Sequence, residues 1–264
     1  MNLKQLCEMI EMPAEVTKTV LSLSERLTQT GLIRVITQQE KAWEACSELE
    51  DLCGEDRDGY TMLTYMLLAA LETQVIYQKR GISDDIFSDT MKCFSRFVRE
   101  HRASFGRYGF DRGYWTYRQL SMTLFRIGTL EYEYADREQV TYIHIPTGAK
   151  LEKPQCAEPY AAVLDFTAKY YSDRANYEFI LDSWLLSPTL DDLLDPDSRI
   201  IQFKNCFQMD SWDKSAADAL QWVFGRRDLS YEKLPEHTSL QRRMKQYLLN
   251  GGVIGCARGH LKGF

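Results

Sequence analysis

Apolar residues recur at helical spacing through the first hundred positions of the chain. Leu3, Leu6 and Ile10 fall on one helix face, and Pro13 follows them as a helix-ending residue. Ser83 is a suitable N-cap residue, and the next two residues are aspartates, which favour the positive end of a helix dipole. The same spacing predicts four further helices in this region, over residues 16–30, 38–53, 59–79 and 84–101.

The pattern changes after Gly106, where period-2 alternation replaces helical spacing. In residues 130–134, LEYEY, Glu131 and Glu133 share one face of a strand, and the leucine and two tyrosines share the other. Residues 140–146, VTYIHIP, predict the next strand. The polar link between these strands is short, which favours an antiparallel hairpin.

The rest of the chain mixes both patterns. They predict a helix over 155–171, a strand over 177–186, a short helix over 187–195, a strand over 199–208, helices over 215–224 and 239–249, and a last strand within 251–264. Helices followed by a mixed α/β run predict an α+β protein with two regions. We expect a helical N-terminal domain over residues 1–104 and an α+β domain, a mixed sheet flanked by helices, over residues 105–264.

Composition and charge narrow the class of protein. The 44% apolar and 27% charged content is ordinary for a soluble globular chain. A net charge of −6 and an isoelectric point near 5.4 argue against a general nucleic-acid binder. No apolar run is long enough to span a bilayer, and the first residues, MNLKQLCEMIEMP, do not have a signal-peptide layout. We therefore expect a cytoplasmic protein with no membrane and no nucleic-acid partner.

The seven cysteines are odd in number and irregularly spaced, and no C-x-x-C pair occurs among them. This pattern predicts reduced thiols, with neither a disulfide framework nor a metal site.

Residues 102–126 carry five arginines against a single acid, Asp111, with seven aromatic residues between them. Basic residues interleaved with aromatics can bind single-stranded nucleic acid by stacking. The acidic balance of the whole chain and the three glycines of this stretch favour a packed connector between the helical domain and the sheet.

Several long stretches resemble a bacterial family of acyltransferase-domain proteins, built from an N-acyltransferase N-terminal domain and a GNAT-like C-terminal domain. They include YGFDRGYWTYRQLSMTLFRIGTLEYEY, IHIPTGA, DSWLLSPTLDDLLDPDSRIIQFK, VFGR and LPEHTSLQRRMKQYLLNGG. The resemblance implies a GNAT-like fold for residues 105–264. It also implies transfer of an acyl group from acetyl-CoA or another acyl-CoA to the amine of a small molecule or peptide, without a metal.

In GNAT proteins, two neighbouring parallel strands separate and the pantetheine arm of acyl-CoA enters between them. Amides of the loop before the next helix bind the pyrophosphate, as helix N-termini bind anions in general. The resemblance places these strands at residues 140–146 and 177–184. The residues expected to contact CoA are Ile145, Pro146, Thr147, Gly148, Ala149, Lys150, Asp182 and Trp184. For Trp184 alone, a role as a core anchor is preferred.

His144 lies near the end of the first of these strands, and it is the preferred general base. Aminolysis of a thioester needs a group that accepts the amine proton, and an imidazole titrates in the right range. The alternative is a half-buried histidine that forms a hydrogen bond at a strand end. Glu131 and Glu133 are the rival bases, because paired carboxylates raise one another's pKa, although such a pair is more often a solvated sheet face.

The chain departs from the GNAT pattern in two places. The loop after residue 146 has one glycine, two lysines and a proline in place of the usual Q/R-x-x-G-x-G/A, and residues 185–200 contain no tyrosine to protonate the leaving thiolate. Ser183 is the substitute proton donor in this region. Direct attack by the amine needs no cysteine nucleophile. The second hypothesis is a non-catalytic ligand-binding or protein-interaction module with the same fold.

Overall fold

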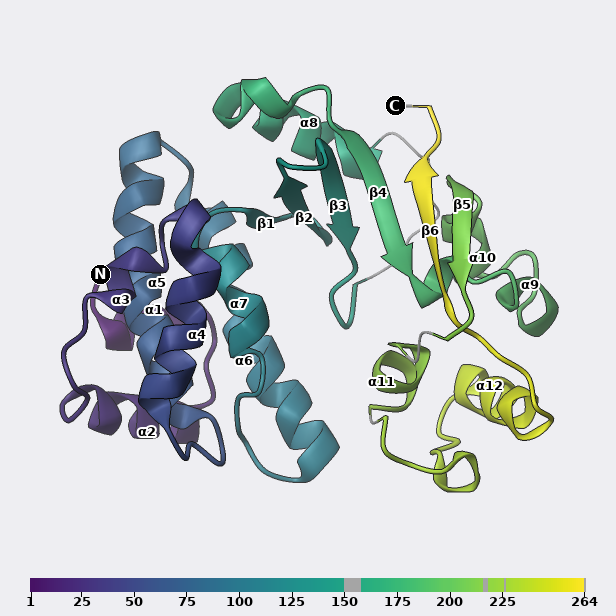
Figure 1. Cartoon of the computed structure of the whole chain (residues 1–264), viewed down its shortest axis with the longest axis horizontal. Helices are drawn as coiled ribbons and strands as arrows, with labels where there is room; N and C mark the ends of the chain where they lie inside the picture. The colour runs from purple at the N-terminus through teal and green to yellow at the C-terminus, as the bar shows by residue number, and fades with distance from the viewer. Residues whose placement is uncertain (150–157, 216–217, 226, 264) are drawn as a thin grey trace. The chain divides into compact units, whose positions relative to one another are not determined.

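The structure is a computed structural model that describes residues 1–149, 158–215, 218–225 and 227–263. The chain forms two compact units, Met1–Ile127 and Gly128–Phe264. Figure 1 shows the helices of the first unit in purple to teal and the sheet of the second in teal to yellow. A helical part followed by a mixed sheet with helices confirms the expected α+β class.

The first unit is built from helices. They are α1 Leu3–Met9, α2 Ala14–Ser24, α3 Leu32–Val35, η1 Gln39–Lys41, α4 Ala42–Cys53, α5 Tyr60–Arg80, α6 Asp84–Phe105 and α7 Gly113–Leu120. The long helix α5 packs against all of the other α-helices of this unit and carries eleven buried residues. Ser83 caps α6 as expected, because its hydroxyl accepts a hydrogen bond from the Ile86 amide.

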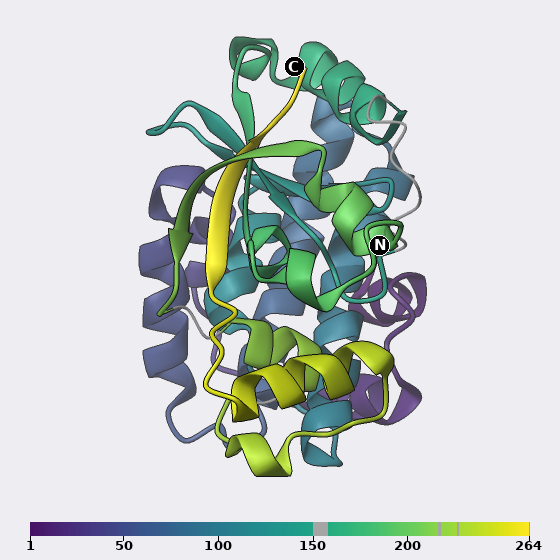
Figure 2. The same ribbon diagram turned by 90° about the vertical axis from the view of Figure 1, so that its right-hand side faces the viewer.

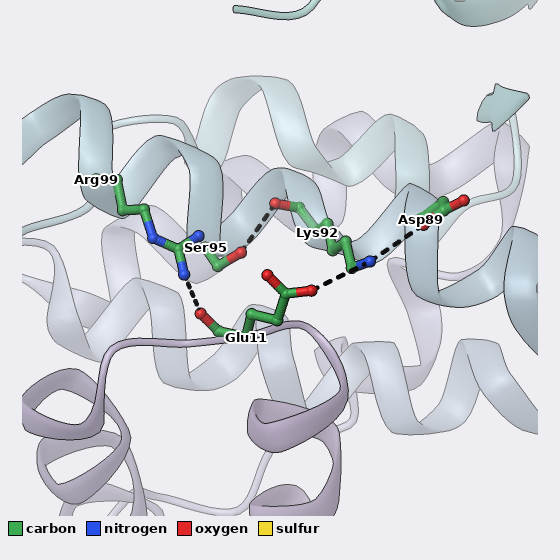
Figure 3. Close-up of polar contacts among 5 residues, drawn as sticks. All are labelled: Glu11, Asp89, Lys92, Ser95 and Arg99. Atoms are coloured by element: carbon green, nitrogen blue, oxygen red, sulfur yellow. Dashed lines mark hydrogen bonds and ion pairs between the residues drawn. The ribbon is translucent and has the colours of Figure 1, made fainter. Parts of the chain in front are cut away.

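The corner between α1 and α2 is fastened to α6 (Figure 3). Glu11 ends α1 with a left-handed backbone at φ 57°. Its carbonyl accepts a hydrogen bond from the Arg99 guanidinium, and its carboxylate lies 3.4 Å from the Lys92 ammonium. These contacts join a turn near the start of the chain to the middle of a helix some eighty residues later.

A mixed sheet of six strands has the order β1-β2-β3-β4-β6-β5. Its strands are β1 Leu124–Ile127, β2 Leu130–Ala135, β3 Val140–His144, β4 Glu178–Ser183, β5 Phe207–Asp213 and β6 Cys256–Leu261. The β2–β3 pair is antiparallel, as the short link predicts, and β3–β4 is parallel. β6 runs antiparallel to both β4 and β5.

The helices of the second unit connect these strands. They are α8 Glu158–Tyr170, η2 Ser172–Arg174, η3 Trp184–Leu186, α9 Leu190–Leu193, α10 Arg199–Lys204, α11 Asp218–Phe224, η4 Tyr231–Lys233 and α12 Ser239–Leu249. α8 packs on one face of the sheet through aromatic contacts, such as Tyr160 against Phe179 with ring centroids 5.9 Å apart. The Tyr134 hydroxyl lies 2.6 Å from Thr167 on the same face.

A cluster of buried apolar residues lies where α11 and α12 meet the end of the sheet (Figures 1 and 2). We call it the C-terminal cluster. Its buried members are Trp184, Leu185, Leu190, Ile201, Ala219, Phe224, Leu234, Met244, Leu248, Ile254 and Cys256.

The strand expected over residues 199–208 is wrong in its first half. Ser198 accepts a hydrogen bond from the Ile201 amide and starts the short helix α10, so the strand begins only at Phe207. The apolar spacing of Ile201 and Phe203 fits a strand as well as a helix, and the capping serine decides the outcome. Residues 124–134 form two strands, because Gly128 turns the chain at φ 65°.

Candidate functional site

The parallel strands β3 and β4 are paired over three rows, which we call the seam. The rows join Val140 to Glu178, Thr141 to Phe179 and Tyr142 to Ile180. Beyond them, β3 continues along β2 and β4 continues along β6, but the described parts of β3 and β4 no longer pair with each other. Figure 1 shows the two arrows moving apart toward their heads. We call this part of the two strands the divergence.

His144 stands on the β3 side of the divergence. Its Nε2 atom lies 2.8 Å from the Glu133 carboxylate, and both side chains are about four-fifths buried. A carboxylate at this distance orients the imidazole. When Nε2 of the neutral ring carries the hydrogen that is donated to Glu133, Nδ1 carries the lone pair. Nδ1 is then the atom that can accept a proton.

Glu131 lies directly across from His144 in the β2–β3 ladder. Alternation therefore places Glu131, Glu133 and His144 on one face of the sheet, as the sequence predicted for the two glutamates. Glu131 is only 2% exposed, so this part of the face is not a solvated one. Glu133 contacts His144 directly and so completes an acid–imidazole pair with it.

Asp182 and Ser183 stand on the β4 side. Because Tyr142 and Ile180 are neighbours in the seam, the residues two further along, His144 and Asp182, have side chains on the same face. Burial raises the pKa of the Asp182 carboxyl, and nearby Arg258 opposes this shift. Ser183 has the opposite orientation by alternation, and its hydroxyl accepts a hydrogen bond from the Leu185 amide at 3.2 Å.

Trp184 and Ile145 lie just beyond the divergence. Trp184 is 9% exposed and belongs to the C-terminal cluster, and Ile145 packs against the same cluster. The position of Trp184 in this core agrees with the role of anchor that the sequence favoured.

The loop after β3 begins with a tight turn. The Ala149 amide donates a hydrogen bond to the Pro146 carbonyl at 2.9 Å. Gly148 has a φ of 82°, which only glycine adopts without strain, and Thr147 is exposed. Lys150, the next residue expected to contact CoA, lies outside the described residues, as do Lys153 and Cys156.

Tyr142 and Arg258, on the same sheet face as His144, meet Glu138 of the turn before β3, and the sequence singled out none of the three as a site residue. The Tyr142 hydroxyl donates a hydrogen bond to the Glu138 carboxylate at 2.6 Å. The Arg258 guanidinium lies 3.2 Å from the same carboxylate oxygen and 5.2 Å from the centre of the Tyr142 ring. Alternation along β3 places Tyr142 on this face from the sequence alone, but nothing in the local sequence connects Arg258 with Glu138, 120 positions earlier.

The arginine- and aromatic-rich stretch makes contacts within the first unit. Arg107 forms an ion pair with Asp58 at 2.8 Å, and the Arg118 guanidinium lies 4.3 Å from the Trp115 ring. These contacts engage Arg107, Trp115 and Arg118 in packing within the first unit.

The described residues contain no group of three or more His, Cys, Asp or Glu side chains that could hold a metal ion. Their cysteines are free thiols, and burial raises the pKa of both Cys46 and Cys256 to about 12. Such thiols are poor nucleophiles near neutral pH. Within the described part of the chain, no helix is both long and apolar enough to cross a bilayer.

Comparison with known proteins identifies the fold. The structure of an acyltransferase in complex with decanoyl-CoA and teicoplanin matches 97% of this chain and 86% of its own, with a TM-score of 0.74 and 20% identity. An acyltransferase mutant in complex with octanoyl-CoA matches 98% of this chain and 86% of its own, with a TM-score of 0.76 and 18% identity. No curated protein matches the sequence.

Two family models match adjoining parts of the chain. Residues 1–122 match the N-acyltransferase N-terminal domain, and residues 124–261 match the GNAT-like C-terminal domain. The family expected from the sequence is therefore confirmed. This chain belongs to the family of proteins in which an N-acyltransferase N-terminal domain precedes a GNAT-like C-terminal domain.

Proposed function

We propose that the chain is an acyl-CoA-dependent N-acyltransferase that transfers the acyl group directly to an amine. The observation that carries this proposal is the divergence of β3 and β4 beside the pair formed by His144 and Glu133. A gap between parallel strands provides unpaired backbone amides and carbonyls, which match the amides of a pantetheine arm. The acid–imidazole pair provides a base at the same place.

The donor in this proposal is an acyl-CoA. The solved structures of similar fold are acyltransferases in complex with decanoyl-CoA or octanoyl-CoA, which supports a thioester donor here. The pantetheine would lie in the divergence, with the phosphates near the turn that contains Thr147 and Gly148. Backbone amides in such a turn, followed by a helix N-terminus, attract phosphate groups.

The reaction then needs a base for the amine and a proton donor for the leaving thiolate. His144 removes a proton from the amine as the nitrogen lone pair attacks the thioester carbonyl, so that a carbon–nitrogen bond forms. The imidazolium is stabilised by Glu133, 2.8 Å away. The carbon–sulfur bond breaks next, and the CoA thiolate takes up a proton, so no covalent intermediate with the protein forms. Ser183 is the candidate donor of that proton from the β4 side.

The acceptor in this proposal carries a basic amine, on a small molecule or a peptide. Glu131, Glu133 and Asp182 place carboxylates around His144 on one sheet face, which favours the approach of a cationic amine. One solved structure of similar fold is that of an acyltransferase in complex with both decanoyl-CoA and teicoplanin, which supports an acceptor other than a large protein here.

Calorimetry and turnover together test the proposal. We expect the protein to bind at least one of acetyl-CoA, octanoyl-CoA and decanoyl-CoA, and to release free thiol from it when a panel of amines is added. His144→Ala should lower kcat by roughly 10²–10⁴-fold without weakening acyl-CoA binding. His260, which pairs with Asp210 at 2.9 Å on the same face, provides the matched control, and His260→Ala should retain activity.

Two results would count against this function. Failure to bind any of the three acyl-CoAs would remove the donor. Binding without thiol release across the amine panel would favour the non-catalytic module instead.

A further inference from the structure

The seam that ends at the divergence is short. Only three rows join β3 to β4, and each strand is held on its other side over a longer span, by β2 or by β6. A ligand that enters the divergence pushes against the last row, Tyr142 and Ile180. Parallel pairing is slightly weaker per residue than antiparallel pairing, so three rows alone give the seam little resistance to opening.

Side chains brace this row on one sheet face. Glu138, in the turn before β3, accepts hydrogen bonds from the Tyr142 hydroxyl at 2.6 Å and from Arg258 at 3.2 Å. Arg258 belongs to β6, and Asp182 of β4 is its direct partner in the ladder. The guanidinium therefore reaches across β4 to contact β3 and the turn that precedes it.

The opposite face of the same rows is also braced. Phe179 of β4 contacts Tyr132 of β2, with ring centroids 6.0 Å apart, and Tyr160 of α8, at 5.9 Å. The two braces meet the sheet at adjacent rows of the seam.

We propose that Arg258 is a positioning residue that, with Glu138 and Tyr142, forms a clasp across β4 and fixes the row at which β3 and β4 begin to diverge. The clasp keeps the divergence in its open shape before ligand arrives, so that binding does not have to reorganise the strands. The hydrogen bond from Tyr142, with the one from Arg258, lowers the pKa of Glu138, so the clasp stays charged around neutral pH. This role rests on the proposed function in one respect, that the ligand entering the divergence is an acyl-CoA.

Hydrogen–deuterium exchange of the full chain without ligand tests the clasp directly. Arg258→Met keeps an unbranched apolar stem but removes the guanidinium, with its charge and its hydrogen bond to Glu138. We expect faster exchange in peptides that cover 140–144 and 178–181, and the same change in Glu138→Gln. Combining the two substitutions should add little to either one, because both break the same contact.

Steady-state kinetics test what the clasp does for the reaction. In Arg258→Met we expect the KM for acyl-CoA to rise by about 3–10-fold, with kcat within about twofold of the wild type, because binding is weakened and the base is untouched. Arg258→Lys should restore part of the change. Arg137→Met removes an exposed arginine from the same turn, whose guanidinium forms no ion pair with the Glu138 carboxylate in the described structure, and should change neither exchange nor KM.

The outcomes separate the clasp from the proposed function. Unchanged exchange in both Arg258→Met and Glu138→Gln would overturn the clasp, whatever the enzyme activity. Faster exchange with an unchanged KM would remove its role in acyl-CoA binding. If the wild-type protein binds no acyl-CoA, the proposed function fails, and the exchange data still decide whether the clasp holds the seam.

Discussion

The alternation of side chains along β2 and β3 determines which residues can meet at the candidate site. The sequence placed Glu131 and Glu133 on one face of a strand and His144 near the end of the next, and the structure brings all three together on one sheet face. Alternation gives the face of a side chain but not its neighbours across the sheet. Arg258 was missed for this reason, since its contact with Glu138 depends on β6 pairing with β4.

The pair formed by His144 and Glu133 leads to a prediction about catalysis. Glu133→Gln preserves the shape of the side chain but removes the charge that stabilises the imidazolium. We expect kcat to fall by roughly 10–100-fold, with the KM for acyl-CoA little changed, in a pH–rate measurement. Asp210→Asn, which alters the pair with His260, is the matched control. A kcat within twofold of the wild type would mean that Glu133 does not support the base.

The buried hydroxyl of Tyr134 leads to a prediction about stability and pH. Burial raises the pKa of Tyr134 to about 12, while in the unfolded chain it is near 10. The native state therefore binds more protons between these values. The stabilisation is complete below pH 10 and is lost as the pH rises toward 12, by about 1–1.5 kcal/mol at pH 11.

Tyr134→Phe isolates this effect. At pH 8 we expect the variant to be less stable by about 1 kcal/mol, because it loses the hydrogen bond to Thr167. At pH 11 the difference should vanish or reverse, since the variant has no phenol to ionise. Urea unfolding at the two pH values measures both free energies, and a constant difference would contradict the assignment.

At the scale of elements, capping and spacing predicted the long helices well. α6 begins after Ser83 as expected, and α12 covers the predicted residues 239–249. Short elements were less predictable, because two or three apolar residues fit the spacing of a strand as well as that of a helix. Whether a helix forms then depends on a capping residue. Ser198 starts α10 where a strand was expected, and the sequence interpretation gave its hydroxyl no weight.

At the end of α1, a residue other than glycine occupies a left-handed backbone position. The Met12 amide donates to the Cys7 carbonyl at 2.8 Å and the Glu11 amide to Glu8 at 3.1 Å, the two hydrogen bonds of a Schellman motif. Glycine normally occupies the left-handed position, which Glu11 fills here at φ 57°. The contacts of Glu11 with Lys92 and Arg99 offset only part of the strain (Figure 3).

Substitution of Glu11 separates these two effects. Glu11→Gly should raise the free energy of unfolding by about 0.5–1 kcal/mol, because relief of the left-handed strain exceeds the loss of one exposed ion pair. Glu11→Ala loses the ion pair and keeps the strain, so it should be neutral or less stable by up to about 0.5 kcal/mol. Urea midpoints compare the three proteins. If Gly were no more stable than Ala, the backbone at Glu11 would not be strained.

At the scale of the whole molecule, the sequence and the structure mark different boundaries. The change in composition after Gly106 suggested domains 1–104 and 105–264, whereas the compact units meet between Ile127 and Gly128. Gly106 ends α6, but α7 follows and packs against α4, α5 and α6. The end of a helix is visible in the sequence as a glycine. The unit with which the next helix packs depends on contacts that no local pattern carries.

Ligand binding should be visible in the stability of the unit that contains the divergence. A ligand that binds only the native state stabilises it by RT ln(1 + [L]/Kd), about 2.7 kcal/mol at one hundred times Kd. For a unit of this size, that free energy raises the midpoint of thermal unfolding by roughly 8–10 °C. Scanning calorimetry with the tightest-binding acyl-CoA measures the shift.

Arg258→Met connects this measurement to the clasp. At a fixed concentration of acyl-CoA well above both Kd values, a 3–10-fold weaker Kd reduces the stabilisation by about 0.7–1.4 kcal/mol, or roughly 2–5 °C of midpoint shift. Without ligand the variant should melt near the wild type, since exposed ion pairs contribute little to stability. An equal ligand-induced shift in both proteins would show that the clasp does not act on binding. A shift that is smaller in the variant, and restored in part by Arg258→Lys, is what a strand-positioning role requires.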